Sequence, residues 1–185
     1  MKKIILTGNP NVGKSVIFSH LTNLGALSSN YPGTTVEILK GKAVLAKNDF
    51  ELVDVPGSYS LDAANKAEEV AAEIINSGDY TLAINVLDAT TLERNLFFAL
   101  SLLKRKIPLL FLLNNWDLAK NKGIKIDLEK LSSELGVRVI PVIATTGEGF
   151  DKLNLQIKEF LENPDAFLPS REIPEKNPEK WILKR

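Results

Sequence analysis

Gly8-Asn9-Pro10-Asn11-Val12-Gly13-Lys14-Ser15 is the stretch that decides the fold of this chain. It reads G-x-x-x-x-G-K-S, and it stands between a short apolar run, Ile4–Leu6, and a segment that suits a helix, Val16–Leu21. A strand before the motif and a helix after it are the context that a phosphate-binding loop requires. In such a loop, backbone N–H groups point towards a polyphosphate and the positive end of the helix dipole adds to the attraction. The sequence therefore predicts a nucleotide-binding loop.

Each fixed letter of this motif has a physical role. Gly8 and Gly13 allow a sharp turn and a close approach of the backbone to phosphate. Lys14 reaches the β- and γ-phosphates, and the Ser15 hydroxyl binds Mg²⁺. The nucleotide contacts predicted from this loop are Gly8, Asn9, Pro10, Asn11, Val12, Gly13, Lys14, Ser15 and Val16.

Apolar runs typical of strands alternate with helical patterns along the chain, which is the signature of a parallel α/β sheet. Val36–Ala46 and Phe50–Val55 flank a turn-like tripeptide, so we expect an antiparallel hairpin there. Further strands are expected at 81–87, 108–113 and 138–143, and helices at 64–76, 92–103, 127–135 and 150–161. The predicted fold class is α/β, a P-loop NTPase with three α/β/α layers, a mostly parallel sheet of about six to seven strands and one antiparallel edge hairpin.

Residues 1–162 are predicted to form one nucleotide-binding domain, and residues 163–185 a proline-rich, charged linker or tail that leaves it. The prolines of the tail prevent a sustained helix. Trp181 is expected to anchor the tail on the surface or to begin a following segment. Residues 23–36 are rich in Gly, Ser, Asn and Pro, so we expect a long loop there.

Composition excludes several classes of protein. The chain has 185 residues, with 23 basic and 23 acidic side chains and a formal net charge of zero, which argues against a dedicated nucleic-acid surface. It has no cysteine, so a disulfide or a cysteine-based metal site is excluded. Neither a signal peptide nor an apolar run near the ~20 residues of a membrane span is found. We expect a cytoplasmic protein.

Three further stretches indicate which nucleotide binds. In Asp54-Val55-Pro56-Gly57, the carboxylate suits an Mg²⁺ ion held through water, and the Gly57 N–H is placed to meet a γ-phosphate; an ordinary turn is the alternative. In Asn114-Asn115-Trp116-Asp117, the Asp117 carboxylate can accept two hydrogen bonds from guanine, a donor pair that adenine lacks. Backbone N–H groups of Ala144-Thr145-Thr146-Gly147 could meet the guanine O6.

Taken in order, these motifs resemble the TRAFAC-class GTPases over roughly residues 1–161, and within that class the G domain of the ferrous-iron transporter B (FeoB) family. Asn30-Tyr31-Pro32-Gly33-Thr34-Thr35-Val36-Glu37 resembles the first switch of that family, and Asp54-Val55-Pro56-Gly57-Ser58-Tyr59-Ser60-Leu61 resembles its second switch. Asn85-Val86-Leu87-Asp88-Ala89 and Leu92-Glu93-Arg94-Asn95-Leu96 resemble two more stretches, which generic GTPases do not need.

The resemblance implies a GTP-binding and GTP-hydrolysing switch domain, dependent on Mg²⁺ and stimulated by K⁺. It also implies that Thr35, which follows Thr34, completes the Mg²⁺ shell begun by Ser15 and Asp54. The nucleotide contacts predicted outside the first loop are Thr34, Thr35, Asp54, Gly57, Asn114, Asn115, Asp117, Ala144, Thr145 and Thr146.

The resemblance assigns K⁺ to Asn11, with Asn30 in the loop that caps the ion. Such a cation would offset charge on the transferring phosphoryl group, as an arginine finger does in other GTPases. Ser58 stands where Ras-like proteins carry a water-orienting Gln, so we expect slow intrinsic turnover. Asn115 and Thr146 replace longer side chains around the base, which favours weak affinity and quick GDP release. The predicted catalytic residues are Lys14, Thr35, Gly57 and Asn11.

The implied partners are a guanine nucleotide, a ferrous-iron membrane transporter region on the same full-length chain, and a second copy in a nucleotide-dependent homo-oligomer. A longer chain of this kind would lie at the cytosolic face of the inner membrane. Two alternatives are a ribosome- or tRNA-associated GTPase, which the neutral charge disfavours, and a GTP/GDP-sensing module with negligible turnover. Asp117 disfavours an ATP-using kinase.

The remaining notable residues favour structural roles. His20, the only histidine, is expected to be structural or solvent-facing, since a lone histidine is not a metal site. Lys104-Arg105-Lys106 suits the C-terminus of a helix, where cations complement the dipole. Arg94 is expected to form a structural salt bridge, and Phe97-Phe98 to lie in the core.

Overall fold

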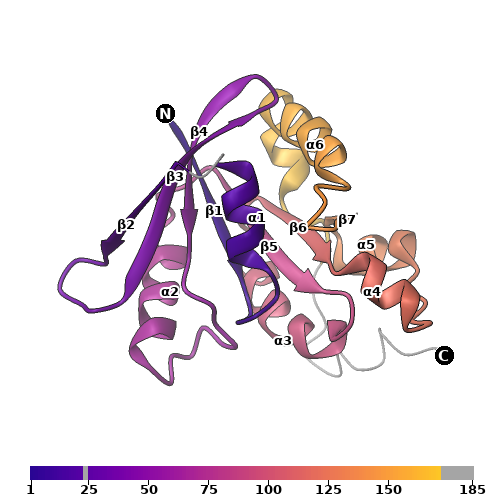
Figure 1. The fold of residues 1–185 in the computed structure, drawn as a ribbon, viewed down its shortest axis with the longest axis horizontal. Helices are drawn as coiled ribbons and strands as arrows, with labels where there is room; N and C mark the ends of the chain where they lie inside the picture. Colours follow the sequence, from indigo (N-terminus) through magenta and orange to yellow (C-terminus); the bar gives the residue numbers. More distant parts are fainter. Residues whose placement is uncertain (23–24, 172–185) are drawn as a thin grey trace.

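The computed structural model describes residues 1–22 and 25–171 of the chain. These residues form a seven-stranded sheet in the order β2-β3-β4-β1-β5-β6-β7 (Figure 1). The strands are β1 (Lys2–Gly8), β2 (Ala26–Asn30), β3 (Glu37–Leu45), β4 (Asn48–Asp54), β5 (Leu82–Asp88), β6 (Leu109–Asn114) and β7 (Arg138–Pro141). The helices are α1 (Lys14–Leu21), α2 (Lys66–Ser77), α3 (Leu92–Leu103), α4 (Trp116–Asn121), α5 (Leu128–Leu135), α6 (Phe150–Glu162) and the 3₁₀ turn η1 (Pro164–Phe167).

The sheet is parallel from β4 through β1, β5 and β6 to β7, and antiparallel where β2 and β3 join β4. The central strands are buried along nearly their whole length, because helices cover both faces. Apolar residues of α1 and α6 pack on one face, and those of α2, α3 and α5 pack on the other (Figure 1). The predicted fold class is confirmed.

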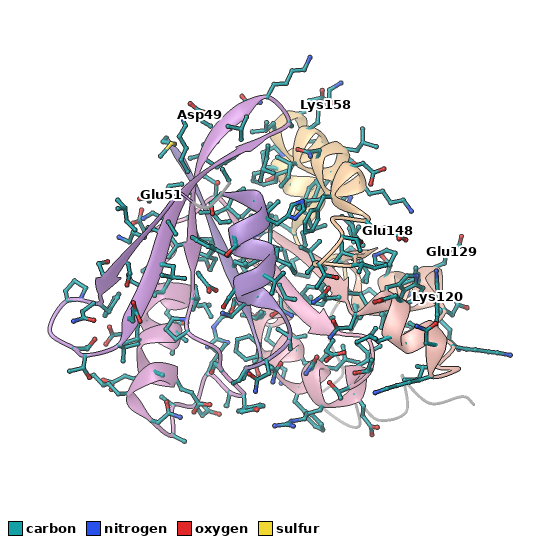
Figure 2. The ribbon with its side chains drawn as sticks, viewed as in Figure 1. Asp49, Glu51, Lys120, Glu129, Glu148 and Lys158 are labelled. Carbon is teal, nitrogen blue, oxygen red and sulfur yellow. The ribbon has the colours of Figure 1, made fainter. Side chains whose placement is uncertain are left out.

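Most charged side chains lie at the periphery of the molecule, and Asp54 and Glu68 are buried exceptions. Asp49 and Glu51 extend from β4, and Lys158 extends from α6 (Figure 2). Lys120 extends from α4, on the other side of the molecule (Figure 2). The surface therefore carries dispersed charges of both signs over several elements, in keeping with the zero net charge of the chain.

Two elements differ from the sequence-based expectation. Residues 26–30 were expected to be part of a loop, but they form the edge strand β2, in which every residue is exposed. This strand has no buried face to give its sequence an alternating pattern, and pairing with β3 holds it in place. The short helix α4 has only 6 residues, too few for a helical periodicity to be visible.

The start of the predicted tail packs on the domain. Phe167 is 2% exposed, its ring meets Phe160 edge-on at 5.4 Å between centroids, and the Arg138 guanidinium lies 4.0 Å from the ring centroid. The Ser170 N–H donates a hydrogen bond of 3.0 Å to the carbonyl of Gly136. The boundary at residue 162 stays a prediction, and Trp181 lies outside the described residues. None of the helices within 1–22 and 25–171 is long and apolar enough to cross a membrane.

Candidate functional site

The predicted phosphate-binding loop connects the end of β1 to the start of α1. Neighbouring strands press closely on its glycines: a Cβ atom on Gly8 would lie 2.5 Å from the carbonyl oxygen of Val86, and one on Gly13 would lie 2.2 Å from Asn114 Nδ2. Gly13 also has a φ of 91°, which an L side chain rarely adopts. The two glycines are therefore required by space as well as by the turn.

Lys14, the first residue of α1, and Asp54, the last residue of β4, form an ion pair beside this loop. The distance from Lys14 Nζ to Asp54 Oδ1 is 2.6 Å, and the two side chains are only 10% and 9% exposed. Asp54 ends β4, and Leu6 on the neighbouring strand is its register partner, so the sheet sets this position. Burial raises the pKa of the Asp54 carboxyl above its ordinary value, and the Lys14 ammonium opposes that shift. Two groups predicted for phosphate and Mg²⁺ are thus side by side.

The start of the second switch is attached to the phosphate loop. Gly57 lies against Pro10, since a Cβ atom on it would be 3.0 Å from Pro10 Cα. The Ser58 N–H donates a hydrogen bond of 3.1 Å to the Gly8 carbonyl, and the buried Ser58 hydroxyl donates to the carbonyl of Ser60. The Ser58 hydroxyl is therefore engaged within the protein.

Asn114 joins the phosphate loop to the predicted base-binding loop. Its amide donates to the carbonyl of Val12 at 2.9 Å and accepts from the Ala144 N–H at 3.0 Å. Asn114 is 2% exposed, so both ends of its side chain are used by the protein. Asp117 lies in the first turn of α4 and is partly exposed. The bridge places the start of α4 beside both loops.

The loop after β7 is exposed at its tip. Thr145 and Thr146 are exposed, and the Thr146 N–H donates to the carbonyl of Ile143 at 3.2 Å. Gly147 lies against the His20 ring, whose centroid is 4.5 Å from that of Phe150. His20 is itself exposed, in keeping with the expected structural or solvent-facing role.

The first switch lies beside α2. The Thr34 hydroxyl donates to the Tyr31 carbonyl at 2.9 Å and accepts from the Val36 N–H at 3.1 Å. Burial first, and then the Glu73 carboxylate of α2, raise the pKa of the Tyr31 hydroxyl. An open pocket of about 540 Å³ separates the switch from the start of α2, and it is lined by Gly33, Thr34, Thr35 and Lys66.

Two predicted site residues therefore stand apart from the phosphate loop in this structure. Thr35 is exposed, and Asn30 is an exposed residue that ends β2 opposite Glu37. The connection between β2 and β3 lies at the outer edge of the sheet (Figure 1). Within the part of the chain that the structure describes, no hydrogen bond joins either side chain to Ser15 or Asn11.

Residues that sequence reasoning missed shape the second switch. The Glu68 carboxylate accepts hydrogen bonds from the N–H groups of Tyr59 at 3.1 Å and Ala64 at 2.9 Å. The Arg94 guanidinium lies 4.6 Å from the centroid of the Tyr59 ring, which makes a cation–π pair. Among residues 1–22 and 25–171, Arg94 forms no ion pair, so the predicted salt bridge is not found there. Asn65 and Glu68 have the spacing of a capping box at the start of α2, which was a usable sequence signal for Glu68. No local pattern marks the Arg94–Tyr59 contact, because the two residues lie on different elements.

The prediction for the Phe97-Phe98 pair is half correct. Phe98 is fully buried, but Phe97 is 52% exposed, because adjacent residues of a helix point about 100° apart. Lys104, Arg105 and Lys106 follow the end of α3, as expected. No cluster of three or more His, Cys, Asp or Glu side chains that would suit a metal ion is found among the described residues.

Comparisons with known proteins agree with this arrangement. The family described as ferrous iron transport protein B matches residues 2–157. The Fe(2+) transporter FeoB of Shigella flexneri is 40% identical over 174 residues, which cover 91% of this chain and 22% of that protein. The FeoB of Salmonella typhimurium matches with the same identity and coverage. The chain thus spans about a fifth of the length of these curated relatives.

Solved structures of FeoB proteins also match this chain. The cytosolic domain of L. pneumophila FeoB has a TM-score of 0.82 at 39% identity, covering 85% of this chain and 63% of that chain. The T. maritima FeoB cytosolic domain in its GMPPNP form has a TM-score of 0.88 at 31% identity, covering 96% and 69%. The T. maritima FeoB G domain has a TM-score of 0.81 at 34% identity, covering 87% of this chain and 99% of that one. The chain therefore belongs to the ferrous iron transport protein B family and has the fold of its G domain.

Proposed function

We propose that this chain binds guanine nucleotides and hydrolyses GTP, as the switch domain of a ferrous-iron transporter. The observation that carries the proposal is the Asn114 bridge, which ties the phosphate loop at Val12 to the predicted base loop at Ala144. A single rigid support for both ends of a nucleotide suits a purine triphosphate site. The T. maritima relative solved in GDP and GMPPNP forms supports the same ligand class.

Phosphate binding would reorganise the Lys14–Asp54 pair. Lys14 would turn towards the β- and γ-phosphates, and the Asp54 carboxylate would become available to Mg²⁺ through water. Mg²⁺ in such sites takes one or two carboxylates and completes its shell with hydroxyl, water and phosphate oxygens, so Ser15 and Asp54 fit it. Bound there, the ion would neutralise charge on the phosphate oxygens.

Turnover would require a movement of the first switch. Thr35 is exposed beside α2, so it would have to approach Ser15 to complete the Mg²⁺ shell. The Gly57 N–H would meet the γ-phosphate from the second switch. With the Ser58 hydroxyl bonded inside the protein, the attacking water would lack a side-chain partner there, and intrinsic hydrolysis would be slow.

The proposal also includes stimulation of hydrolysis by K⁺, with Asn11 and Asn30 as the residues that hold the ion. Asn11 has a φ of 65° and an exposed side chain in the phosphate loop, where an amide oxygen can face an ion against the phosphates. The GTPase rate in KCl should exceed the rate in NaCl, and Asn11→Ala should remove the difference. An unchanged K⁺-stimulated rate in Asn11→Ala would overturn this assignment while leaving the GTPase proposal intact.

The base preference is tested separately. GTP should compete with a fluorescent GDP analogue far better than ATP does. Asp117→Asn should weaken GTP and favour xanthosine triphosphate, which carries a carbonyl acceptor in place of the exocyclic amine donor of guanine. Tighter binding of ATP than of GTP would overturn the guanine assignment. The engaged Ser58 hydroxyl is also compatible with a sensing module that does not hydrolyse GTP. Multiple turnovers under saturating Mg²⁺-GTP would distinguish an enzyme from such a module.

The wider role is also a proposal. Because the chain spans about 22% of the curated transporters, we propose that it acts at the cytosolic face of the inner membrane, coupled to a transporter region of the same full-length protein. Sedimentation with GDP and with a GTP analogue would detect the proposed nucleotide-dependent homo-oligomer. Co-sedimentation with ribosomes would favour the translation-associated alternative instead.

A further inference from the structure

Three buried polar side chains have no hydrogen-bond partner within the described residues: Thr7 near the end of β1, Asn9 just after it, and Asn85 on the neighbouring strand β5. Thr7, Asn9 and Asn85 are 0%, 2% and 0% exposed. Among residues 1–22 and 25–171, no hydrogen bond is made by Thr7 Oγ1 or by the side-chain oxygen and nitrogen of Asn9 and Asn85. Buried polar groups are almost always paired with protein or with ordered water, so this group needs an explanation.

The sheet places two of these side chains side by side. Thr7 of β1 is the register partner of Asn85 of β5 in a parallel pair. Partners in neighbouring strands point to the same face, and the residues two positions earlier, Ile5 and Ala83, lie in the apolar layer under α3. Thr7 and Asn85 therefore face that layer. Thr7 directly precedes Gly8, the first residue of the phosphate loop, and Asn9 follows Gly8 in the loop.

The chemistry of the three side chains selects a water molecule. The hydroxyl of Thr7 and the amides of Asn9 and Asn85 offer both donors and acceptors. A monovalent cation would satisfy their oxygens and leave the amide N–H groups unpaired, whereas a water can accept and donate. A buried water makes about three hydrogen bonds in proteins, and three polar side chains are present.

We propose that Thr7, Asn9 and Asn85 enclose a buried water that fixes the phosphate loop to β5, and that Asn85 is a positioning residue for phosphate binding. Asn9 lies within the loop, so its fixed amide would hold the loop backbone in the conformation that meets the phosphates. Asn85 belongs to the N-V-L-D-A stretch, for which the nucleotide contacts proposed above have no use. The affinity readout of this inference rests on the proposed nucleotide binding; its stability readout does not.

Isosteric substitutions test the water bridge. Asn85→Leu and Thr7→Val keep the side-chain volume and remove the polar atoms. We expect Asn85→Leu to weaken binding of a fluorescent GDP analogue about fivefold, the equilibrium factor of one net hydrogen bond. Because both changes act through the same water, the double variant should be weakened about as much as the more severe single variant, and not by the product of the two factors.

Thr22→Val is the matched control. Thr22 is also a buried threonine, but its hydroxyl donates to the Phe18 carbonyl at 2.8 Å, far from the phosphate loop along α1. It should lower the midpoint of chemical unfolding and leave GDP affinity unchanged. A purely structural role for Asn85 would give this same pattern in Asn85→Leu and would overturn its positioning role. Asn85→Ser, which retains a hydroxyl and leaves room for a second water, should restore part of the affinity.

Unfolding separates failure of this inference from failure of the nucleotide proposal. If the unsubstituted chain binds no GDP, the proposed function is wrong, and the bridge is still tested by stability. A water bridge predicts that Asn85→Leu and Thr7→Val each destabilise the fold and are not additive. If the atoms are unpaired, both changes should stabilise the fold, which would overturn the inference. A high-resolution crystal structure without a water between the three side chains would also overturn it.

Discussion

Replacing Asn114 by alanine should break the support shared by the two ends of the proposed nucleotide site. The amide of Asn114 holds the carbonyl of Val12 at 2.9 Å and the N–H of Ala144 at 3.0 Å. Val12 is 2% exposed and Ala144 is 4% exposed, so water does not readily replace the lost partner. Each unpaired buried backbone group costs about 1–3 kcal/mol. Asn114→Ala should therefore lower the free energy of unfolding by about 2–6 kcal/mol.

Asn154 provides a control with the same chemistry. Its amide oxygen accepts from the Ala46 N–H at 2.9 Å, and its nitrogen donates to the Phe150 carbonyl at 3.1 Å. The Asn154 side chain is exposed and lies on α6, so water can take over both bonds in Asn154→Ala. We expect that variant to lose about 1 kcal/mol of stability or less, without a change in nucleotide binding.

Two measurements on the same pair of variants separate stability from binding. Urea unfolding gives the free energy of each variant, and displacement of a fluorescent GDP analogue gives its dissociation rate. The rate for Asn114→Ala should rise at least about tenfold, which corresponds to about 1.4 kcal/mol of lost binding free energy. Equal losses of stability in Asn114→Ala and Asn154→Ala would show that the buried bridge is not a special support. A large loss of stability with an unchanged GDP dissociation rate would show that it supports the fold but not the nucleotide.

Substitutions at three further residues test other features of the structure. Phe167→Ala should cost about 3–5 kcal/mol of unfolding free energy, because Phe167 is buried against Phe160; a loss below about 1 kcal/mol would leave the domain boundary at residue 162 standing. Arg94→Ala should cost less than about 1 kcal/mol overall, but it should speed hydrogen exchange in the second switch around Tyr59, and Arg94→Lys should do so less. Burial raises the pKa of Tyr80 to about 12, so the folded chain holds that proton where an unfolded tyrosine, with a pKa of about 10, has lost it. This contribution to stability is complete below about pH 10 and is lost as the pH rises towards 12, and Tyr80→Phe should flatten the fall measured by urea unfolding at stepped pH.

The fold could be predicted wherever a short stretch of sequence carries its own signal. The apolar runs at 82–87 and 109–113 are buried on both faces, so their composition alone indicates parallel central strands. The strand β2 carries no such signal, because its five residues are all exposed and only pairing with β3 defines it. The helix α4 is set by Asn115, whose φ of 58° turns the chain after β6, and a positive φ at that position is not visible in the sequence.

The candidate site divides in the same way. The phosphate loop is contiguous, so its position between β1 and α1 followed from the motif. The bridge of Asn114 could not be predicted, because it depends on where the ends of β1, β6 and β7 meet. The exposed position of Thr35 depends on where the connection between β2 and β3 lies at the edge of the sheet, which no spacing of residues encodes (Figure 1). Sequence motifs identify the predicted site residues, and the order of the strands in the sheet determines which of these residues are in contact.

The Lys14–Asp54 pair links the proposed binding of phosphate to that of Mg²⁺. Both side chains are about nine-tenths buried, so each needs its partner as long as the other stays charged. Phosphate that draws Lys14 away would leave the Asp54 carboxylate buried and unpaired, and burial already raises its pKa. A divalent ion beside Asp54 would replace the positive charge of the Lys14 ammonium. If the ion bound without phosphate, Lys14 would stay beside Asp54 and would face a second positive charge. Phosphate and Mg²⁺ should therefore each bind more tightly in the presence of the other, by a coupling that is reciprocal by thermodynamic necessity. The strength of that coupling depends on the burial of Lys14 and Asp54. If the same two side chains were exposed to solvent, the coupling between phosphate and Mg²⁺ would be weak.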